Sequence, residues 1–210
     1  MECECELKPE ETEVLSSILR FILKHEKSPT IRELRLSLKR SEKEIIRALD
    51  ELEKKGDFLV RKKGTQEIVS IYPVSLKPTE HRIFLEDGTK LFAMCAVDAL
   101  GMPIMFKKNV RVTSRCLECK SEMTFEIKNE QTTFMSHPDA TICSPKRQVY
   151  PAAETCCPLV NFFCSKKHAE EWIAKNFELV DKTNTIVSVQ QAFPNIKKCW
   201  KSYGELLGLR

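Results

Sequence analysis

Apolar residues recur at helical spacing in three blocks of the N-terminal third of the chain. The first block, residues 9–26, begins with a proline and acidic residues, as helices often do. Thr30 is a candidate N-cap for a second, short helix, and Ser41 with Glu44 forms a capping box for a third. We therefore expect three helices before residue 56.

Residues 57–73 follow these blocks and read as two strands around a basic turn, Lys62-Lys63-Gly64, which predicts a β-hairpin. Three helices followed by a hairpin is the winged helix-turn-helix pattern. Pro73 and Pro78 then flank a short segment that we interpret as a linker. The expected boundary between two domains is at residues 78 and 79.

After this boundary the pattern changes to short strands mixed with helical segments. Residues 81–93 predict two strands joined by an Asp-Gly turn, followed by an apolar helical segment. The other expected elements are strands at 109–116, 123–129 and 185–193 and a helix that Ser165 caps. The predicted fold class is α+β: an N-terminal winged-helix-like three-helix domain (1–78), then a mixed α+β catalytic domain with antiparallel strands (79–210).

Charge and hydropathy exclude some classes of protein. No apolar run reaches the roughly 18 residues that a membrane span needs, and the N-terminus is acidic, unlike a signal peptide. We therefore expect a cytoplasmic protein that does not bind a membrane. The net charge is +4, and the expected recognition helix at 42–55 mixes acidic and basic residues, which disfavours nucleic acid as a partner.

Cysteine is the residue type that points to chemistry. The chain has ten cysteines and four histidines, and a cytoplasmic chain keeps its thiols reduced, so metal binding or thiol chemistry is a better hypothesis than a disulfide framework. A sulfur-rich donor set favours soft metals. The cysteines are Cys3, Cys5, Cys95, Cys116, Cys119, Cys143, Cys156, Cys157, Cys164 and Cys199.

The stretch LFAMCAVDALGMP, residues 91–103, places one thiol and one carboxylate in an otherwise apolar segment. If it is helical, Cys95 and Asp98 are three positions apart and share a face. A buried carboxyl group beside a thiol can exchange a proton with it. The alternative is a core cysteine beside a surface aspartate.

Two further cysteine motifs have open interpretations. Cys156 and Cys157 precede an apolar, strand-like run, in which adjacent side chains point to opposite faces, so either one alone would join a pocket. Cys116 and Cys119 form a CxxC between two strands, which is compatible with zinc, a redox pair or simple packing. Cys3 and Cys5 carry no specific expectation.

Taken in order, the motifs LFAMCAVDALGMP, VRVTSRC, CPLVNFF and IVSVQQAF resemble the organomercurial lyase (alkylmercury lyase) family over residues 83–193. By this resemblance, Cys95 and Asp98 match the family's thiol and acid, and Cys157 matches its second thiol. Cys116 matches a further, structural cysteine.

The resemblance implies cleavage of the carbon–mercury bond by protonolysis, which yields a hydrocarbon and Hg(II). Cys95 and Cys157 would bind mercury and Asp98 would supply the proton, with Cys156, Cys116 and Cys119 as candidate additional metal ligands. The implied partners are an organomercury substrate and, as acceptor of Hg(II), low-molecular-weight thiols or a mercuric reductase, in keeping with mercuric resistance. No cofactor is required beyond exogenous thiols, and Zn at Cys116 and Cys119 is an additional candidate.

Three positions depart from the family pattern. Met94 and Cys156 stand where aromatic residues are more usual, and Cys119 completes a CxxC that better-known members lack. These departures leave two alternatives on the same fold: a soft-metal-responsive DNA-binding regulator, or a thiol-based metal carrier. Neither alternative needs the acid Asp98.

Overall fold

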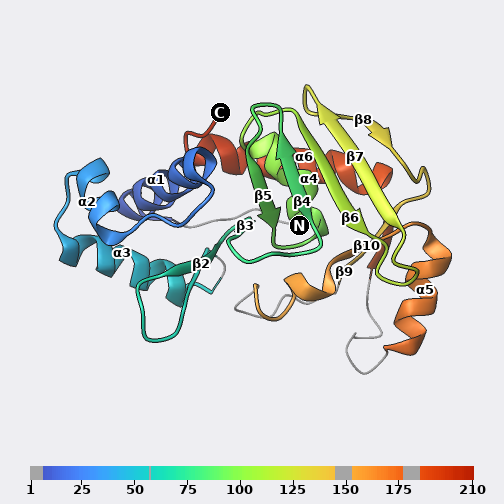
Figure 1. The fold of residues 1–210 in the computed structure, drawn as a ribbon, viewed down its shortest axis with the longest axis horizontal. Helices are drawn as coiled ribbons and strands as arrows, with labels where there is room; N and C mark the ends of the chain where they lie inside the picture. The colour runs from blue at the N-terminus through green and yellow to red at the C-terminus, as the bar shows by residue number, and fades with distance from the viewer. Residues whose placement is uncertain (1–6, 57, 145–152, 177–184) are drawn as a thin grey trace.

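A computed structural model describes residues 7–56, 58–144, 153–176 and 185–210 of the chain (Figure 1). Its helices and strands form the α+β fold that the hydrophobic pattern predicted. Among the helices in these ranges, none is both long and apolar enough to cross a membrane.

The N-terminal region contains the three predicted helices. They are α1 (Pro9–His25), α2 (Ile31–Leu38) and α3 (Glu42–Lys54). Thr30 and Ser41 cap α2 and α3, because each hydroxyl oxygen accepts a hydrogen bond from the backbone N–H three residues later. Apolar residues of all three helices are buried, as the helical spacing indicated, and they belong to one hydrophobic core that continues into the rest of the fold.

A large antiparallel sheet begins with the predicted hairpin and continues through the strands that follow it as far as Met135. Its strand order is β1-β2-β3-β5-β4-β6-β7-β8. The strands are β1 (Leu59–Arg61), β2 (Ile68–Ile71), β3 (Val74–Ser75), β4 (Arg82–Leu85), β5 (Lys90–Ala93), β6 (Val110–Arg115), β7 (Glu122–Lys128) and β8 (Gln131–Met135). The hairpin is thus the edge of a sheet whose centre lies in the following region.

The segment between Pro73 and Pro78 is more ordered than a linker. It contains β3, which pairs with β2 on one side and with β5 on the other. Its backbone groups therefore complete the ladder between the hairpin and the central strands, a long-range pairing that local composition does not reveal. The division of the chain at residues 78 and 79 stays a prediction.

A second, smaller sheet has the order β10-β9-β11. Its strands are β9 (Thr141–Ser144), β10 (Asn161–Phe163) and β11 (Thr185–Ser188), and the helix α5 (Lys166–Lys175) follows β10. Ser165 caps α5, as predicted. The strands β8 and β9 had not been predicted, because the polar alternation of β8 and the brevity of β9 give little signal.

The end of the chain corrects one prediction. Residues 185–193 are one strand only as far as Ser188, where the helix α6 (Val189–Leu206) begins. Ser188 and Gln191 form a capping box, so the local signal for a helix start was present but hidden by the alternating pattern before it.

The helix α4 (Ala96–Met105) is packed against α6, and both lie along one face of the large sheet (Figure 1). Gly101 permits this packing, since a Cβ atom there would lie 2.0 Å from Nε1 of Trp200. Trp200 in turn stacks on Tyr72, with ring centroids 5.0 Å apart. These contacts fix the position of α4, which has Cys95 as its N-cap and Asp98 in its first turn.

Candidate active site

Cys95 lies at the junction between the strand β5 and the helix α4. It is the N-cap residue of α4, with an extended backbone, and its sulfur accepts a hydrogen bond from the backbone N–H of Asp98 at 3.4 Å. The sequence had suggested that both residues lie within the helix; instead, Cys95 caps it and Asp98 is in the first turn. A helix N-terminus stabilises negative charge, so this position favours a thiolate.

Asp98 is almost fully buried, with 1% of its surface exposed. Its Oδ2 atom has no hydrogen-bond partner within the described residues. Burial raises the pKa of the Asp98 carboxyl well above its usual range, and negative charge at Cys95 raises it further. The buried site therefore favours the protonated form of the carboxyl group.

The pKa of Cys95 moves in the opposite direction. Burial alone would raise it, but hydrogen bonds from Cys157 and from Asp98 outweigh burial and lower the pKa of the Cys95 thiol below its ordinary value. Cys95 and Asp98 thus form a pair in which the thiol loses its proton readily while the acid keeps one.

Cys157 reaches the same place from a distant part of the sequence. It begins a short 3₁₀ helix, η1 (Cys157–Leu159), just before β10. The backbone N–H of Ala96 donates to the carbonyl oxygen of Val160 at 3.0 Å and so holds the end of this turn beside the start of α4. The ligand atoms of Cys95, Asp98 and Cys157 all lie within 4.8 Å of one another, and all three residues are buried.

The vicinal cysteines are not in an extended strand, which corrects the sequence interpretation. Cys156 has helical backbone angles and Cys157 starts η1, where Pro158 restricts the backbone. Both are buried, so the rule that neighbours in a strand face opposite ways does not apply. The compact three-residue group contains Cys157; Cys156 is adjacent, and its charge would raise the pKa of Asp98.

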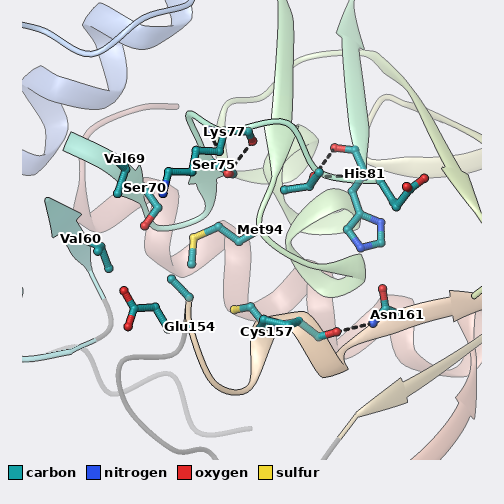
Figure 2. A pocket seen from close by; sticks show the side chains of 14 residues that line it. Val60, Val69, Ser70, Ser75, Lys77, His81, Met94, Glu154, Cys157 and Asn161 are labelled. Atoms are coloured by element: carbon teal, nitrogen blue, oxygen red, sulfur yellow. Dashed lines mark hydrogen bonds between the residues drawn. The ribbon is translucent and has the colours of Figure 1, made fainter. Parts of the chain in front are cut away.

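A cavity of about 280 Å³ leads to this group (Figure 2). Cys157 lines it, whereas Cys95 and Asp98 lie outside its lining. Figure 2 shows Met94 and Cys157 with their sulfur atoms turned toward the space bordered by Val60 and Glu154. Cys157 is therefore the first of the three groups that a molecule in the cavity would meet.

The β1–β2 hairpin forms one wall of this cavity. Val60 of β1 and Val69 and Ser70 of β2 line it, and Figure 2 shows them opposite the turn that carries Cys157. The winged-helix-like region thus contributes one wall of the cavity. This role of the hairpin was not apparent from the sequence, since it depends on the strand order of the large sheet.

Two other residues near the site have perturbed pKa values. His81, which lines the cavity, is 4% exposed, and burial lowers its pKa to about 4. Burial, together with negative charge on Asp98 and Cys95, raises the pKa of Tyr72 well above its usual value. Both side chains are therefore neutral at pH 7 and contribute no charge to the site.

The CxxC motif lies at a second cluster, away from this site. Cys116 and Cys119 meet a cysteine and a histidine that the sequence analysis had not selected, and all four ligand atoms lie within 4.8 Å of one another. We call this set of three cysteines and one histidine the Cys3His cluster, a name that does not refer to residue 3. Its members are Cys116, Cys119, Cys164 and His168. The spacing of Cys164 and His168, four positions apart, was the available signal. Cys3 and Cys5 lie outside the described residues.

Comparison with known proteins identifies the family. The alkylmercury lyase (MerB) family model matches residues 74–200, which is more than half of the chain. An alkylmercury lyase of Staphylococcus epidermidis (strain ATCC 12228 / FDA PCI 1200) is 27% identical over 124 residues, 58% of this chain and 54% of that protein. One of Pseudomonas putida is 32% identical over 116 residues, 53% of each. The chain spans about half the length of these curated relatives.

The fold is also similar to a solved structure. The crystal structure of the mercury-bound form of MerB2 matches with a TM-score of 0.80 and 22% sequence identity, and the match covers 95% of this chain and 93% of that one. This likeness extends over the N-terminal helices as well as the region that the family model matches. The family match over residues 74–200 confirms the resemblance first seen in the cysteine motifs: the chain belongs to the alkylmercury lyase family.

Proposed function

We propose that this protein is an organomercurial lyase, which cleaves the carbon–mercury bond by protonolysis to give a hydrocarbon and Hg(II). The observation that carries the proposal is the group of two thiols and one buried acid within 4.8 Å, at the positions where the family motifs occur. Two thiols would suffice to bind mercury. The acid gives the site a way to transfer a proton to carbon.

Capture of the substrate is the first step. Mercury is a very soft cation and prefers thiolate to water or carboxylate. Cys157 lines the cavity and Cys95 has a lowered thiol pKa, so an organomercury cation that enters past Cys157 can be transferred to Cys95. As the mercury–sulfur bonds form, the two thiol protons pass to solvent or to the exogenous thiolate that the organomercury cation leaves behind, and Asp98 keeps its own proton.

Proton transfer to carbon is the second step. With both sulfurs bound to mercury, electron density shifts toward the carbon, and Asp98 can deliver its proton there. The electron pair of the carbon–mercury bond forms the new carbon–hydrogen bond, and no oxidant or reductant is needed. Hg(II) remains on Cys95 and Cys157, and Asp98 is left as a carboxylate that can accept the next thiol proton.

The apolar surroundings of Asp98 serve this step. Water in the site would stabilise the carboxylate and lower its pKa, so that fewer molecules would hold the required proton. Three apolar residues of α4 that neighbour Asp98 in the sequence are fully buried: Ala96, Ala99 and Leu100. We infer that small alkyl and aryl mercurials are the substrate class, since their organic groups suit a dry site.

Release of Hg(II) requires a thiol acceptor, because a mercury ion on two buried thiolates does not leave for water. Low-molecular-weight thiols or a mercuric reductase would remove it, and a reducing cytoplasm provides such thiols. No resident cofactor has a part in this scheme. Exogenous thiol is thus the expected requirement for more than one turnover.

The test is hydrocarbon release. Reduced, metal-stripped protein is incubated with phenylmercury or methylmercury and excess thiol, and benzene or methane is followed by gas chromatography. We expect many turnovers from the unaltered protein and none from Cys95→Ser or Cys157→Ser. Cys156→Ser is the matched control that separates the two vicinal thiols, and we expect it to retain activity.

Stoichiometric mercury binding without hydrocarbon would contradict the proposal and leave a metal carrier. The DNA-binding regulator is not favoured, because basic side chains of the winged-helix-like region are paired with acids. Arg61 contacts Asp50 and Glu53 within 2.6 Å, and Lys55 contacts the buried Glu11 at 2.6 Å. Such pairing leaves these side chains little positive charge to offer to phosphates.

A further inference from the structure

We propose that the Cys3His cluster binds one Zn²⁺ ion and is a structural metal site, separate from the site at Cys95. The CxxC alone provides only two of the four ligands that a structural zinc site needs. The fold supplies the other two, Cys164 and His168, from a segment about 45 residues later in the chain. The inference does not depend on the proposed lyase activity, since it concerns different side chains and a different measurement.

The donor set is the type that structural zinc sites use. Such sites are closed and tetrahedral, with four cysteine or histidine ligands, and pairs of ligands are a few residues apart in sequence. Cys116 and Cys119 make a C-x₂-C pair, and Cys164 and His168 make a C-x₃-H pair. Three sulfurs and one nitrogen complete the coordination, and the set contains no carboxylate that would act as an acid.

The distances between ligand atoms agree with this geometry. Tetrahedral zinc places two sulfurs about 3.8 Å apart and a sulfur and a nitrogen about 3.6 Å apart. Sγ of Cys119 lies 3.8 Å from Sγ of Cys164, and Sγ of Cys116 lies 3.7 Å from Nδ1 of His168. Sγ of Cys164 and Nδ1 of His168 are 2.9 Å apart, so this pair must separate by several tenths of an ångström to bind zinc.

The CxxC is on a tight turn between β6 and β7 that directs both sulfurs to one side. The backbone N–H of Cys116 donates to the carbonyl of Ser121, and that of Lys120 donates to the carbonyl of Cys116, both at 2.9 Å. Lys120 has a positive φ of 61°, which reverses the chain after Cys119. A turn of this kind brings both cysteines of a CxxC to one metal ion, as the zinc interpretation of this motif requires.

The other two ligands come from the start of α5. Ser165 caps this helix and accepts a hydrogen bond from the backbone N–H of His168 at 3.3 Å. The cap places His168 in the first helical turn, directly beside Cys164 at the end of β10. The four ligands thus come from well-formed local structures on two segments, and not from mobile ends.

The exposures of the ligands distinguish this cluster from the Cys95 group. Cys116 is fully buried, Cys164 and His168 are half-buried, and Cys119 is exposed. A metal ion here lies at the surface, whereas Cys95 is buried behind the cavity that Cys157 lines. Histidine as fourth ligand and a closed tetrahedron suit zinc, while mercury is satisfied by two thiolates.

The ion would join two parts of the fold. The backbone N–H of Leu117, between the two cysteines of the CxxC, already donates to the carbonyl of Phe162 in β10 at 3.1 Å. Seven positions separate Cys164 from Cys157, so the ion would hold the end of the segment that carries the catalytic thiol. We infer that zinc fixes this segment against the β6–β7 turn.

The test is metal content together with a spectroscopic signature. The full chain, purified under reducing conditions with zinc in the medium, should contain one zinc per chain by plasma mass spectrometry. Replacement of zinc by Co²⁺ should give the intense visible bands of a tetrahedral site and the near-ultraviolet charge-transfer bands of thiolate ligands. Both signatures should persist in Cys95→Ser, which alters only the other cluster.

Variants of the cluster complete the experiment. Cys119→Ser and His168→Ala should lose zinc during dialysis against a mild chelator and lose the tetrahedral cobalt spectrum, while Cys143→Ala, a buried cysteine outside both clusters, should keep both. The unaltered protein supplies the cobalt readout even if a variant fails to fold. Zinc retained by both cluster variants, no metal on the reduced unaltered protein, or a Cys119–Cys164 disulfide that persists under reductant would overturn the proposal.

Discussion

The two cysteine clusters of this protein use the same thiol chemistry in opposite surroundings. Cys95, Asp98 and Cys157 are buried, include a carboxyl group and are reached through a cavity. The Cys3His cluster reaches the surface and has four ligands without an acid. A site that turns over needs an open coordination position and a proton donor, whereas a site that only holds a metal needs a complete donor set.

The comparison shows which neighbours change the role of a thiol. At Cys95, hydrogen bonds from Cys157 and Asp98 lower the thiol pKa against the effect of burial. In the Cys3His cluster, hydrogen bonds from Ser121 lower the pKa of Cys119 to about 6, while burial raises that of Cys164 to about 11. The second cluster has no buried acid to exchange protons with.

The largest expected effect comes from removing Asp98, the acid that only one of the two clusters contains. Asp98→Asn should reduce kcat for hydrocarbon release by about 10²–10⁴-fold, because the amide cannot donate the proton that the carboxyl group supplies. Turnover is measured by gas chromatography, and Glu118→Gln, near the other cluster, is the control. An Asp98→Asn protein with undiminished turnover would refute the proton-transfer step.

The same variant should be more stable than the unaltered protein. The pKa of Asp98 is raised in the folded state, so its contribution to stability is fully present below the unfolded pKa near 3.8 and is lost as the pH rises. At pH 7 the neutral amide avoids this cost, and Tm should rise by about 2–4 °C for each kcal/mol relieved. A lower Tm would indicate that the amide is packed badly and would weaken the kinetic result.

Metal removal should affect stability more than chemistry. If the Cys3His cluster holds zinc, chelation should lower Tm by about 5 °C or more, because the ion binds the folded state and not the unfolded chain. Thermal unfolding followed by circular dichroism, with and without chelator, measures this shift. Cys119→Ser should have a low Tm that chelator does not change. If chelator lowers Tm equally in both proteins, the shift does not come from a metal ion at the Cys3His cluster.

The buried His81 contacts β10, the strand between Cys157 and Cys164, and a variant at His81 tests how its burial affects stability. It packs edge-on against Phe162 of β10, and its Nδ1 atom lies 3.0 Å from the hydroxyl of Ser114. Its folded pKa is about 4, so stability is complete above the unfolded pKa near 6.5 and falls by about 3 kcal/mol as the pH drops to 4.

His81→Gln should therefore flatten the pH dependence of stability. Urea unfolding at pH 7.5 and at pH 4.5 measures the difference for both proteins. His25→Gln, at the exposed histidine that ends α1, is the matched control and should leave the slope of the unaltered protein in place. Identical pH dependence in the His81 variant would mean that another group titrates.

The smallest expected effect concerns the cavity in front of the proposed catalytic group. Met94 lines it beside Cys157, so Met94→Phe should narrow the approach (Figure 2). We expect KM for phenylmercury to rise by up to about tenfold and KM for methylmercury to change less, because discrimination by size in an apolar pocket is modest. Equal changes for both substrates would show that Met94 does not select for the organic group.

The sequence by itself determined much of the N-terminal region and the proximity of Cys95 and Asp98, the pair that we propose to be reactive. Helical spacing and the caps at Thr30 and Ser41 depend on neighbouring residues only, so they could be predicted, and α2 and α3 begin where the caps indicated. Cys95 and Asp98 are likewise three positions apart, and a helical start of any kind brings them together.

Tertiary structure decided everything that depends on pairing between distant segments. The strand β3 forms because β2 and β5 lie on either side of it, and the vicinal cysteines are in a turn that is held to the start of α4. Cys164 and His168 join the CxxC only because β10 passes beside the β6–β7 turn. Local propensity cannot reveal such contacts, since the free energy that forms them comes from burial and hydrogen bonds between segments far apart in the chain.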